Sequence, residues 1–340
     1  MRIAILMLFV LCSTLVEAQA DKQSVKLEVG RYVEAVYSAA ATFLNQKRPD
    51  AERIKAIAPY AVIYDAKQVE GFKSTVLDAQ ESPEVRGAAL RRISEHISAD
   101  PRLMKQVTQW LGDPGSARPL REAALDVEQG LSFMFMASPD VYQKMLDDPE
   151  PAIRMFAFTK LVAHGDARAQ QRLIRGLDSS GDAPLPAVHA ISILTMAPKP
   201  EFYPAAYKLM RETKDPAIRI EAIRVLGPYQ EARQSLVGIA QDGGEKAEFR
   251  EAALGALYSG DPDNIVSYVA PIVRDESAPP RLQAIGIRMT MDVRQSNKLR
   301  ANAKRADEYD RLVQKVAREA RDGEVRIVAD RYIEAVKPRY

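Results

Sequence analysis

One short pattern returns along the chain and limits the folds that it can adopt. Ser82-Pro83-Glu84-Val85-Arg86-Gly87-Ala88-Ala89-Leu90, closed by Ile93, is one copy, and Asp215 to Ile223, closed by Leu226, is another. In each copy an apolar residue precedes an arginine, and apolar residues follow three, four and seven positions later. At about 100° per residue these positions share one face, so each copy predicts an amphipathic helix. A repeat of this kind is typical of stacked architectures that serve as binding proteins.

The copies align on that arginine, which we call the anchor and which alanine replaces once: Arg86, Arg121, Arg154, Ala187, Arg219, Arg250, Arg281 and Arg326. Successive anchors are 31 to 35 residues apart, except for a last step of 45, which indicates an insertion. The third residue after every anchor is alanine: Ala89, Ala124, Ala157, Ala190, Ala222, Ala253, Ala284 and Ala329. A small residue at the centre of each apolar face predicts that two helix backbones approach closely there.

A second set of apolar-periodic segments lies between these helices: Arg102 to Leu111, Val141 to Leu146, Ala167 to Leu177, Phe202 to Met210, Arg233 to Ala240 and Ile265 to Val273. Each ends near a turn with Asp, Gly or Pro, and Asp followed by Pro favours a helix start. Because no run of alternating apolar residues is bounded by turns, we predict no strands. The predicted fold is all-α, a right-handed α-solenoid of about eight stacked antiparallel helix pairs.

The Asp-Pro turn, the Val/Ile-Arg pair and the alanine three residues later resemble HEAT repeats, especially the short bacterial HEAT-like (phycobilisome-lyase-type) kind. The resemblance covers about residues 66–293 and a divergent last copy near 324–336. It implies that the recurrent arginines and turn aspartates form a structural ladder between neighbouring units. Six arginines are then expected to be structural and not ligand-binding: Arg86, Arg121, Arg154, Arg219, Arg250 and Arg281.

The N-terminus predicts export. Arg2 precedes an almost unbroken apolar run from Ile3 to Val16, and Ala18-Gln19-Ala20 is a small-x-small cleavage pattern. This is the layout of a signal peptide, with cleavage after Ala18 or Ala20; an uncleaved anchor is the alternative. The one cysteine, Cys12, lies inside this run, so the mature chain has no disulfide and no thiolate metal site. The expected location is a bacterial periplasm or the outside of the cell.

The chain therefore divides into a signal peptide (1–20), N-terminal capping helices (21–65), the HEAT-like array (66–293), and a basic insertion with a C-terminal capping repeat (294–340). A formal net charge of +2 implies no bulk attraction to nucleic acid. Residues 294–321 carry nine Lys or Arg against four acidic residues. This segment is either a solvated capping helix or a basic surface for anionic lipid or another polyanion.

The sequence offers no arrangement typical of catalysis. Its three histidines, His96, His164 and His189, are not at metal-ligand spacing, and it has neither a phosphate loop nor a Gly-x-Ser-x-Gly elbow. This departs from the HEAT-like metal hydroxylases, which need paired His-Glu motifs. Trp110 has the spacing of a core residue, unlike the tryptophan of the HEAT-like DNA glycosylases, and export argues against a bilin lyase. We predict no catalytic, cofactor-binding or metal-binding residue and no cofactor; a lyase or hydrolase with a site assembled only by folding stays open.

A stacked repeat binds partners on its concave face, which the motif helices line. The positions one, two and five after the anchor point away from the apolar face and form the predicted partner-binding set: Arg91, Glu122, Asp126, Met155, Phe156, Thr159, His189, Glu221, Arg224 and Glu251. Its centre is apolar and its flanks are charged. Phe133 to Met136 is either a buried helix end or an exposed contact patch. The sequence thus predicts an exported, non-enzymatic scaffold for protein partners, with an envelope-associated protein that uses 294–321 as the alternative.

Overall fold

The structure, a computed structural model, describes residues 22–60, 65–130, 138–178, 183–295 and 303–336. These residues form 18 α-helices and no strand, which confirms the all-α class. The predicted signal peptide and the Phe133 to Met136 cluster lie outside the described residues.

The contacts divide the chain into two compact units, unit 1 up to Ala157 and unit 2 from Phe158, so that the boundary lies inside α9 (Pro151–Ala163). The helices before it are α2 (Lys22–Leu44), α3 (Asp50–Ile57), α4 (Ala66–Leu77), α5 (Pro83–Arg92), α6 (Pro101–Gly112), α7 (Arg118–Gly130) and α8 (Pro139–Met145). Those after it are α10 (Ala167–Asp178), α11 (Ala187–Leu194), α12 (Phe202–Glu212), α13 (Pro216–Val225), α14 (Arg233–Gln241), α15 (Ala247–Gly260), α16 (Ile265–Arg274), α17 (Pro280–Gln295), α18 (Ala303–Glu319) and α19 (Gly323–Val336). Three short 3₁₀ turns are η1 (Ser94–His96), η2 (Gln230–Ala232) and η3 (Pro262–Asn264).

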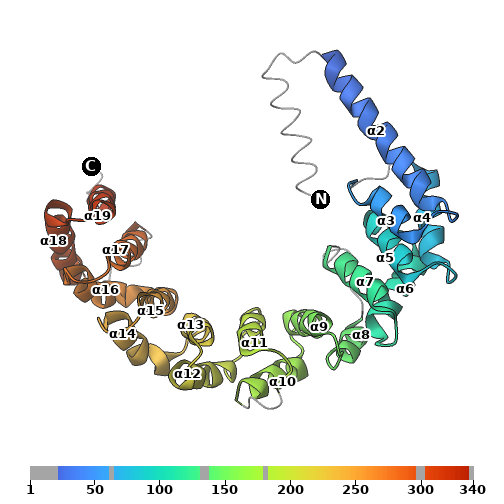
Figure 1. Cartoon of the computed structure of the whole chain (residues 1–340). Coiled ribbons are helices and arrows are strands. Elements are labelled where there is room, and N and C mark those ends of the chain that lie inside the picture. Colours follow the sequence, from blue (N-terminus) through green and yellow to red (C-terminus); the bar gives the residue numbers. More distant parts are fainter. Residues whose placement is uncertain (1–21, 61–64, 131–137, 179–182, 296–302, 337–340) are drawn as a thin grey trace. The chain divides into compact units, whose positions relative to one another are not determined.

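Within each unit the helices pack in two layers (Figure 1). Even-numbered helices form a first-helix layer, in which α4 packs on α2 and α6, and α16 packs on α14 and α18. Odd-numbered helices form a second-helix layer, in which α5 packs on α3 and α7, and α15 packs on α13 and α17. Every aligned anchor lies on an odd-numbered helix, so the motif of the sequence generates the second-helix layer.

Side-chain caps and prolines start several of these helices as the sequence predicts. Pro216 opens α13, and Asp215 Oδ1 accepts hydrogen bonds from the backbone N–H groups of Ala217 and Ile218 at 2.8 and 3.3 Å. Asp113-Pro114 behaves differently, because Asp113 accepts from the N–H of Gly115 and forms a turn, and α7 begins only at Arg118.

The alanines of the motif lie at the centre of the packed faces. All eight are at most 2 % exposed: Ala89, Ala124, Ala157, Ala190, Ala222, Ala253, Ala284 and Ala329. Backbones also approach closely at glycines of the same layer. A Cβ on Gly87 of α5 would lie 2.8 Å from the carbonyl oxygen of Pro119 in α7, and a Cβ on Gly260 would lie 1.8 Å from that of Gly227. These positions admit no side chain without movement of the neighbouring backbone.

The long last step between anchors corresponds to two long helices, α17 with 16 residues and α18 with 17. α18 packs on α16 and α19, and α19 packs on α17, so this pair continues the two layers of unit 2. Among the helices that the structure describes, none combines the length and apolar character needed to cross a bilayer.

Candidate partner-binding surface

The predicted partner-binding residues all lie on second-helix elements, from α5 to α15. Those on α5 and α7 belong to unit 1, α9 spans the boundary, and those on α11, α13 and α15 belong to unit 2. The structure therefore brings them together as two groups, one in each unit.

In unit 1 the predicted charged residues are paired on the surface. Arg91 Nε of α5 lies 2.6 Å from Asp126 Oδ2 of α7, which ties two neighbouring helices. Glu122 pairs with Arg118 one turn earlier on α7 at 2.8 Å. Because these side chains are well exposed, solvent screens both pairs and each adds little to stability. A charged partner could displace them at little cost.

On α9 the two apolar residues predicted to form the centre of the binding surface differ in exposure. Met155 is 36 % exposed and Thr159 is half-buried, but Phe156 is only 7 % exposed and meets the ring of Tyr142 edge-on at 6.0 Å. The expected exposure of Phe156 is thus wrong. The second position after the anchor lies at the border of the packed face, so a large apolar side chain turns inward there.

Because the second position lies at this border, the burial of its side chain differs among the other repeats. Ala123 and Ala252 are buried, Glu221 is half-buried and His189 is exposed. The first and fifth positions after the anchor are exposed or half-buried in most repeats, while Gly87, Leu282 and Gly286 are buried there. A helical wheel centred on the buried alanine would have found this difference from the sequence.

In unit 2 the surface of the second-helix layer mixes aliphatic and paired polar groups. Glu221 forms an ion pair with Arg224 on α13, and Glu251 of α15 accepts from Arg281 of α17 at 3.0 Å. Val188 and Ile220 are half-buried at the first position after their anchors. The sequence analysis did not include Tyr258 of α15, at the eighth position after the anchor Arg250. Its hydroxyl donates a hydrogen bond to Asp292 of α17. The predicted charged residues of this unit are thus each engaged in an ion pair: Glu221 and Arg224 with each other, and Glu251 with Arg281.

The recurrent arginines tie consecutive helix pairs together. The guanidinium of Arg219 reaches Glu245, in the turn of the next pair, at 2.7 and 3.2 Å, and Arg121 reaches Asp148 in the same way. Another tie joins the pairs within unit 1, where Arg53 donates to both carboxylate oxygens of Glu81 at 2.7 and 2.8 Å.

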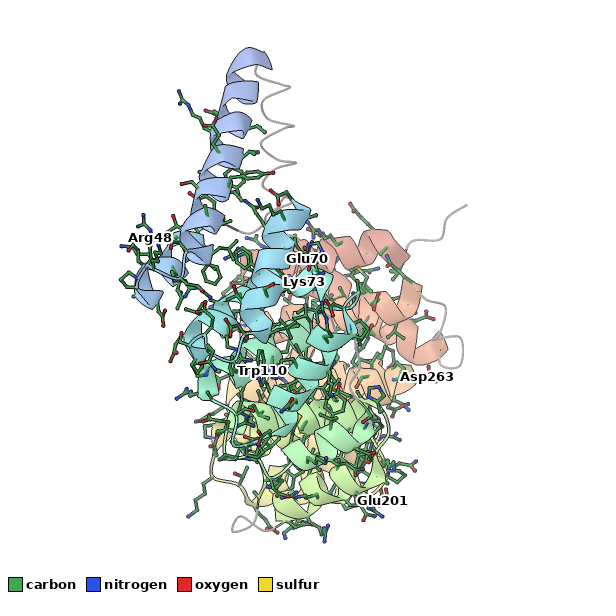
Figure 2. The ribbon with its side chains drawn as sticks, turned by 90° about the vertical axis from the view of Figure 1, so that its right-hand side faces the viewer. Arg48, Glu70, Lys73, Trp110, Glu201 and Asp263 are labelled. Carbon is green, nitrogen blue, oxygen red and sulfur yellow. The ribbon has the colours of Figure 1, made fainter. Side chains whose placement is uncertain are left out.

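Other arginines of the series cap the preceding helix. Arg86 Nε donates to the carbonyl oxygen of Val76 at 3.0 Å, and Arg250 Nε donates to that of Ala240 at 3.1 Å. Burial lowers the pKa of Arg86. Its guanidinium also lies over the ring of Trp110, which is buried in unit 1 (Figure 2), as its spacing predicted. Arg154 donates to the carbonyl oxygen of Asp148 at 2.6 Å. Only Arg121 makes the contact with a turn aspartate of the next pair that the resemblance implies; Arg219 reaches a glutamate, and Arg86, Arg154 and Arg250 donate to backbone carbonyl oxygens.

Arg281 departs from this ladder. Its side chain is 75 % exposed and pairs with Glu251 of the preceding helix of the same layer, not with a turn carboxylate. Arg281 is therefore a surface residue next to the candidate partner-binding residues of unit 2.

All three histidines are exposed, and His189 is so as predicted. In the part of the chain that the structure describes, no group of three His, Cys, Asp or Glu side chains is placed to hold a metal ion. Comparison with known proteins adds no assignment: no family model matches the chain, and no curated protein matches it significantly.

Proposed function

We propose that the chain is an exported, non-enzymatic scaffold that binds protein partners on its second-helix layer. In this proposal the chain is a right-handed α-solenoid of about eight HEAT-like repeats, and the second-helix layer lines its concave face. The partner is a peptide or helix that lays apolar side chains against the half-buried aliphatic residues and replaces exposed ion pairs with its own charges.

The observation that carries the proposal is the contrast between framework and surface positions. The third position after the anchor is a buried alanine in every repeat. The fifth position holds five different residue types and is exposed or half-buried in every repeat but that of Gly286: Arg91, Asp126, Thr159, Ser192, Arg224, Gly255, Gly286 and Arg331. A constant frame with a variable outward surface is how repeat proteins present a specific binding face.

Crosslinked affinity capture from the exported fraction of the host tests this function. Wild type is compared with Met155→Asp and Arg224→Glu, two changes at exposed positions of the second-helix layer. Gln234→Glu, at an exposed position of α14 in the first-helix layer, is the matched control. We expect a protein that wild type and the control enrich and that at least one of the two variants loses. Equal enrichment by all four proteins would show that this layer is not the binding face.

Contact with an anionic surface through α18 is the second candidate function. Arg311, Lys315 and Arg318 are exposed and share one face of α18. Three acids, Asp307, Glu308 and Glu319, are exposed on the same helix. We therefore expect weak binding that salt abolishes. Sedimentation with vesicles of phosphatidylcholine, with and without about one third phosphatidylglycerol, measures it, and equal recovery with both vesicles would remove this candidate.

A further inference from the structure

Where α2, α3 and α5 meet in unit 1, the side chain of Arg92 carries a charge that no described acidic group balances. Its Nη2 donates a hydrogen bond to the carbonyl oxygen of Ile57, the last residue of α3, at 2.7 Å. In the part of the chain that the structure describes, this is the one hydrogen bond of the guanidinium, and no acidic side chain forms an ion pair with it. Its Nε is buried without an acceptor.

A cation in such a position is usually compensated by a carboxylate or by an aromatic ring. Arg53 and Arg121, which are more deeply buried in the same unit, each reach a carboxylate, and Arg86 lies over the ring of Trp110. Burial lowers the pKa of Arg92, which reflects the cost of removing its charge from water. An anion supplied from outside the described chain would offset this cost.

A ligand can reach the guanidinium of Arg92 from solvent. Among the described residues Nη1 has no acceptor, and it is not one of the unpaired atoms that are buried. The hydrogen bond to Ile57 caps the C-terminal end of α3, but this structural role uses only Nη2. Nη1 therefore remains available as a donor at the surface.

Two tyrosines lie beside this cation. The N–H of Tyr60 donates to the same carbonyl oxygen of Ile57, at 3.1 Å, so the backbone of Tyr60 is next to the guanidinium of Arg92. The ring of Tyr60 meets that of Tyr32 in α2 edge-on at 5.9 Å, and Tyr32 is 39 % exposed. Tyr32 is also near enough to Arg92 to oppose the lowering of its pKa. The site thus combines one cation with an exposed aromatic pair.

We propose that Arg92 binds the C-terminal carboxylate of a peptide whose last residue is apolar. One uncompensated guanidinium matches the single charge of a carboxylate, and the rings of Tyr32 and Tyr60 offer a surface for an apolar side chain. At a chain terminus the carboxylate and the last side chain share one Cα, so both reach a cation and rings that lie side by side. Two exposed acids and one exposed base flank Tyr32 on α2, which disfavours a polyanion: Glu28, Glu34 and Arg31.

This site goes beyond the proposed binding on the second-helix layer and does not depend on it. Arg92 is the sixth residue after the anchor Arg86 and is not one of the predicted partner-binding residues. One charge-assisted contact and one ring contact bind a short peptide weakly, with a dissociation constant of about 1–10 mM.

Nuclear magnetic resonance of the purified protein, labelled with ¹⁵N-arginine, tests the proposal. Because Nε of Arg92 is buried, its proton exchanges slowly with water, and its resonance is the one that Arg92→Gln lacks. The probe is N-acetylglycylphenylalanine, titrated to about 50 mM at constant ionic strength, and its C-terminal amide is the uncharged control. We expect the acid to shift this resonance in a saturable way and the amide to leave it in place.

Line broadening of the peptide's own resonances compares the variants. Arg92→Gln should weaken binding by about tenfold or more, because the charge is lost. Tyr32→Ala should weaken it by about threefold or more, because a ring contact is lost. Arg48→Gln, which removes an exposed arginine of the same unit that already pairs with Glu52, should leave binding unchanged. Circular dichroism shows whether each variant keeps its helix content, and the comparison of acid with amide needs wild type alone.

Three results would overturn the proposal. Equal shifts with acid and amide, or none with either, would show that Arg92 binds no carboxylate. Unchanged affinity of a folded Arg92→Gln variant would place the peptide elsewhere. N-acetylaspartylphenylalanine amide carries its carboxylate on a side chain, and binding as tight as that of the acid would exclude recognition of a chain terminus. None of these results bears on Met155 or Arg224, so the proposed function is tested separately.

Discussion

Replacing Arg53 tests whether the arginine ties hold consecutive helix pairs together. This side chain is 2 % exposed in α3 and makes three hydrogen bonds: two to the carboxylate of Glu81 and one, from Nε at 2.7 Å, to the carbonyl oxygen of Phe43. Arg53→Met keeps most of the volume of the side chain and removes all three. Glu81 then keeps the hydrogen bond from Gln46 Nε2 at 2.9 Å, but loses its cation.

The expected loss follows from these contacts. Removing one partner of a buried ion pair costs about 3–5 kcal/mol, since the other charge is left without compensation. The Arg53 hydrogen bonds hold the pKa of Glu81 below its ordinary value of 4.5. A lowered folded pKa stabilises the protein above the unfolded pKa, and this contribution disappears as the pH falls through the folded value. The difference between wild type and Arg53→Met is therefore complete at neutral pH and shrinks below about pH 4.5.

Hydrogen exchange gives the decisive assay because it reads each helix separately. Among the described helices, α3 has extensive contacts only with α2 and α5. We therefore expect the loss of the Arg53 contacts to increase local unfolding of α2 and α3 and to leave unit 2 unchanged. Exchange in α3 should accelerate by about two to three orders of magnitude at pH 7. Lys55→Met, at an exposed position of the same helix, is the control and should change little. Unchanged exchange in α3 of the Arg53 variant would refute the structural role of these arginines.

Four further predictions concern packing and pH. Ala222→Leu overpacks a fully buried position and should lower the free energy of unfolding by about 1–3 kcal/mol, measured by urea unfolding. Gly87→Ala places a Cβ 2.8 Å from the Pro119 carbonyl oxygen and should lower the melting temperature. Gly238→Ala meets nothing within 4 Å and should instead stabilise by about 0.5–1 kcal/mol, so a loss there would contradict the packing argument. The side chain of Arg102 lowers the pKa of Asp100 to about 2, so stability from this group is complete above about pH 4 and is lost toward pH 2; Asp100→Asn should flatten this part of the pH profile of urea unfolding.

Much of the fold follows from local pattern. The second set of predicted segments agrees with α6, α8, α10, α12, α14 and α16 to within about two residues at each end. This is possible because the apolar periodicity of an amphipathic helix identifies both the helix and the face that it buries. The first pair, α2 and α3, carries the same signal, since Arg53 stands 33 residues before Arg86 and Ala56 follows it by three. The signal is weaker there, because Glu52 precedes Arg53 where the other copies mostly have an apolar residue.

The candidate surface was less predictable. The sequence gives the angle of Phe156 around α9, but its burial depends on Tyr142, whose ring comes from the preceding helix. Likewise, the apolar positions of α2 continue along the helix, yet Phe43 is buried and Val29 is exposed. Phe43 is covered because α3 and α4 pack on that part of α2, and they do not cover Val29.

By itself the sequence determined the helices, their buried faces and the recurrence of one frame, because residues within a few turns of one another encode these properties. The tertiary structure decided which carboxylate each arginine reaches, which outward side chains stay exposed and how much of α2 is covered. Those outcomes depend on distances between helices that lie a whole repeat apart, and packing of the assembled layers sets these distances.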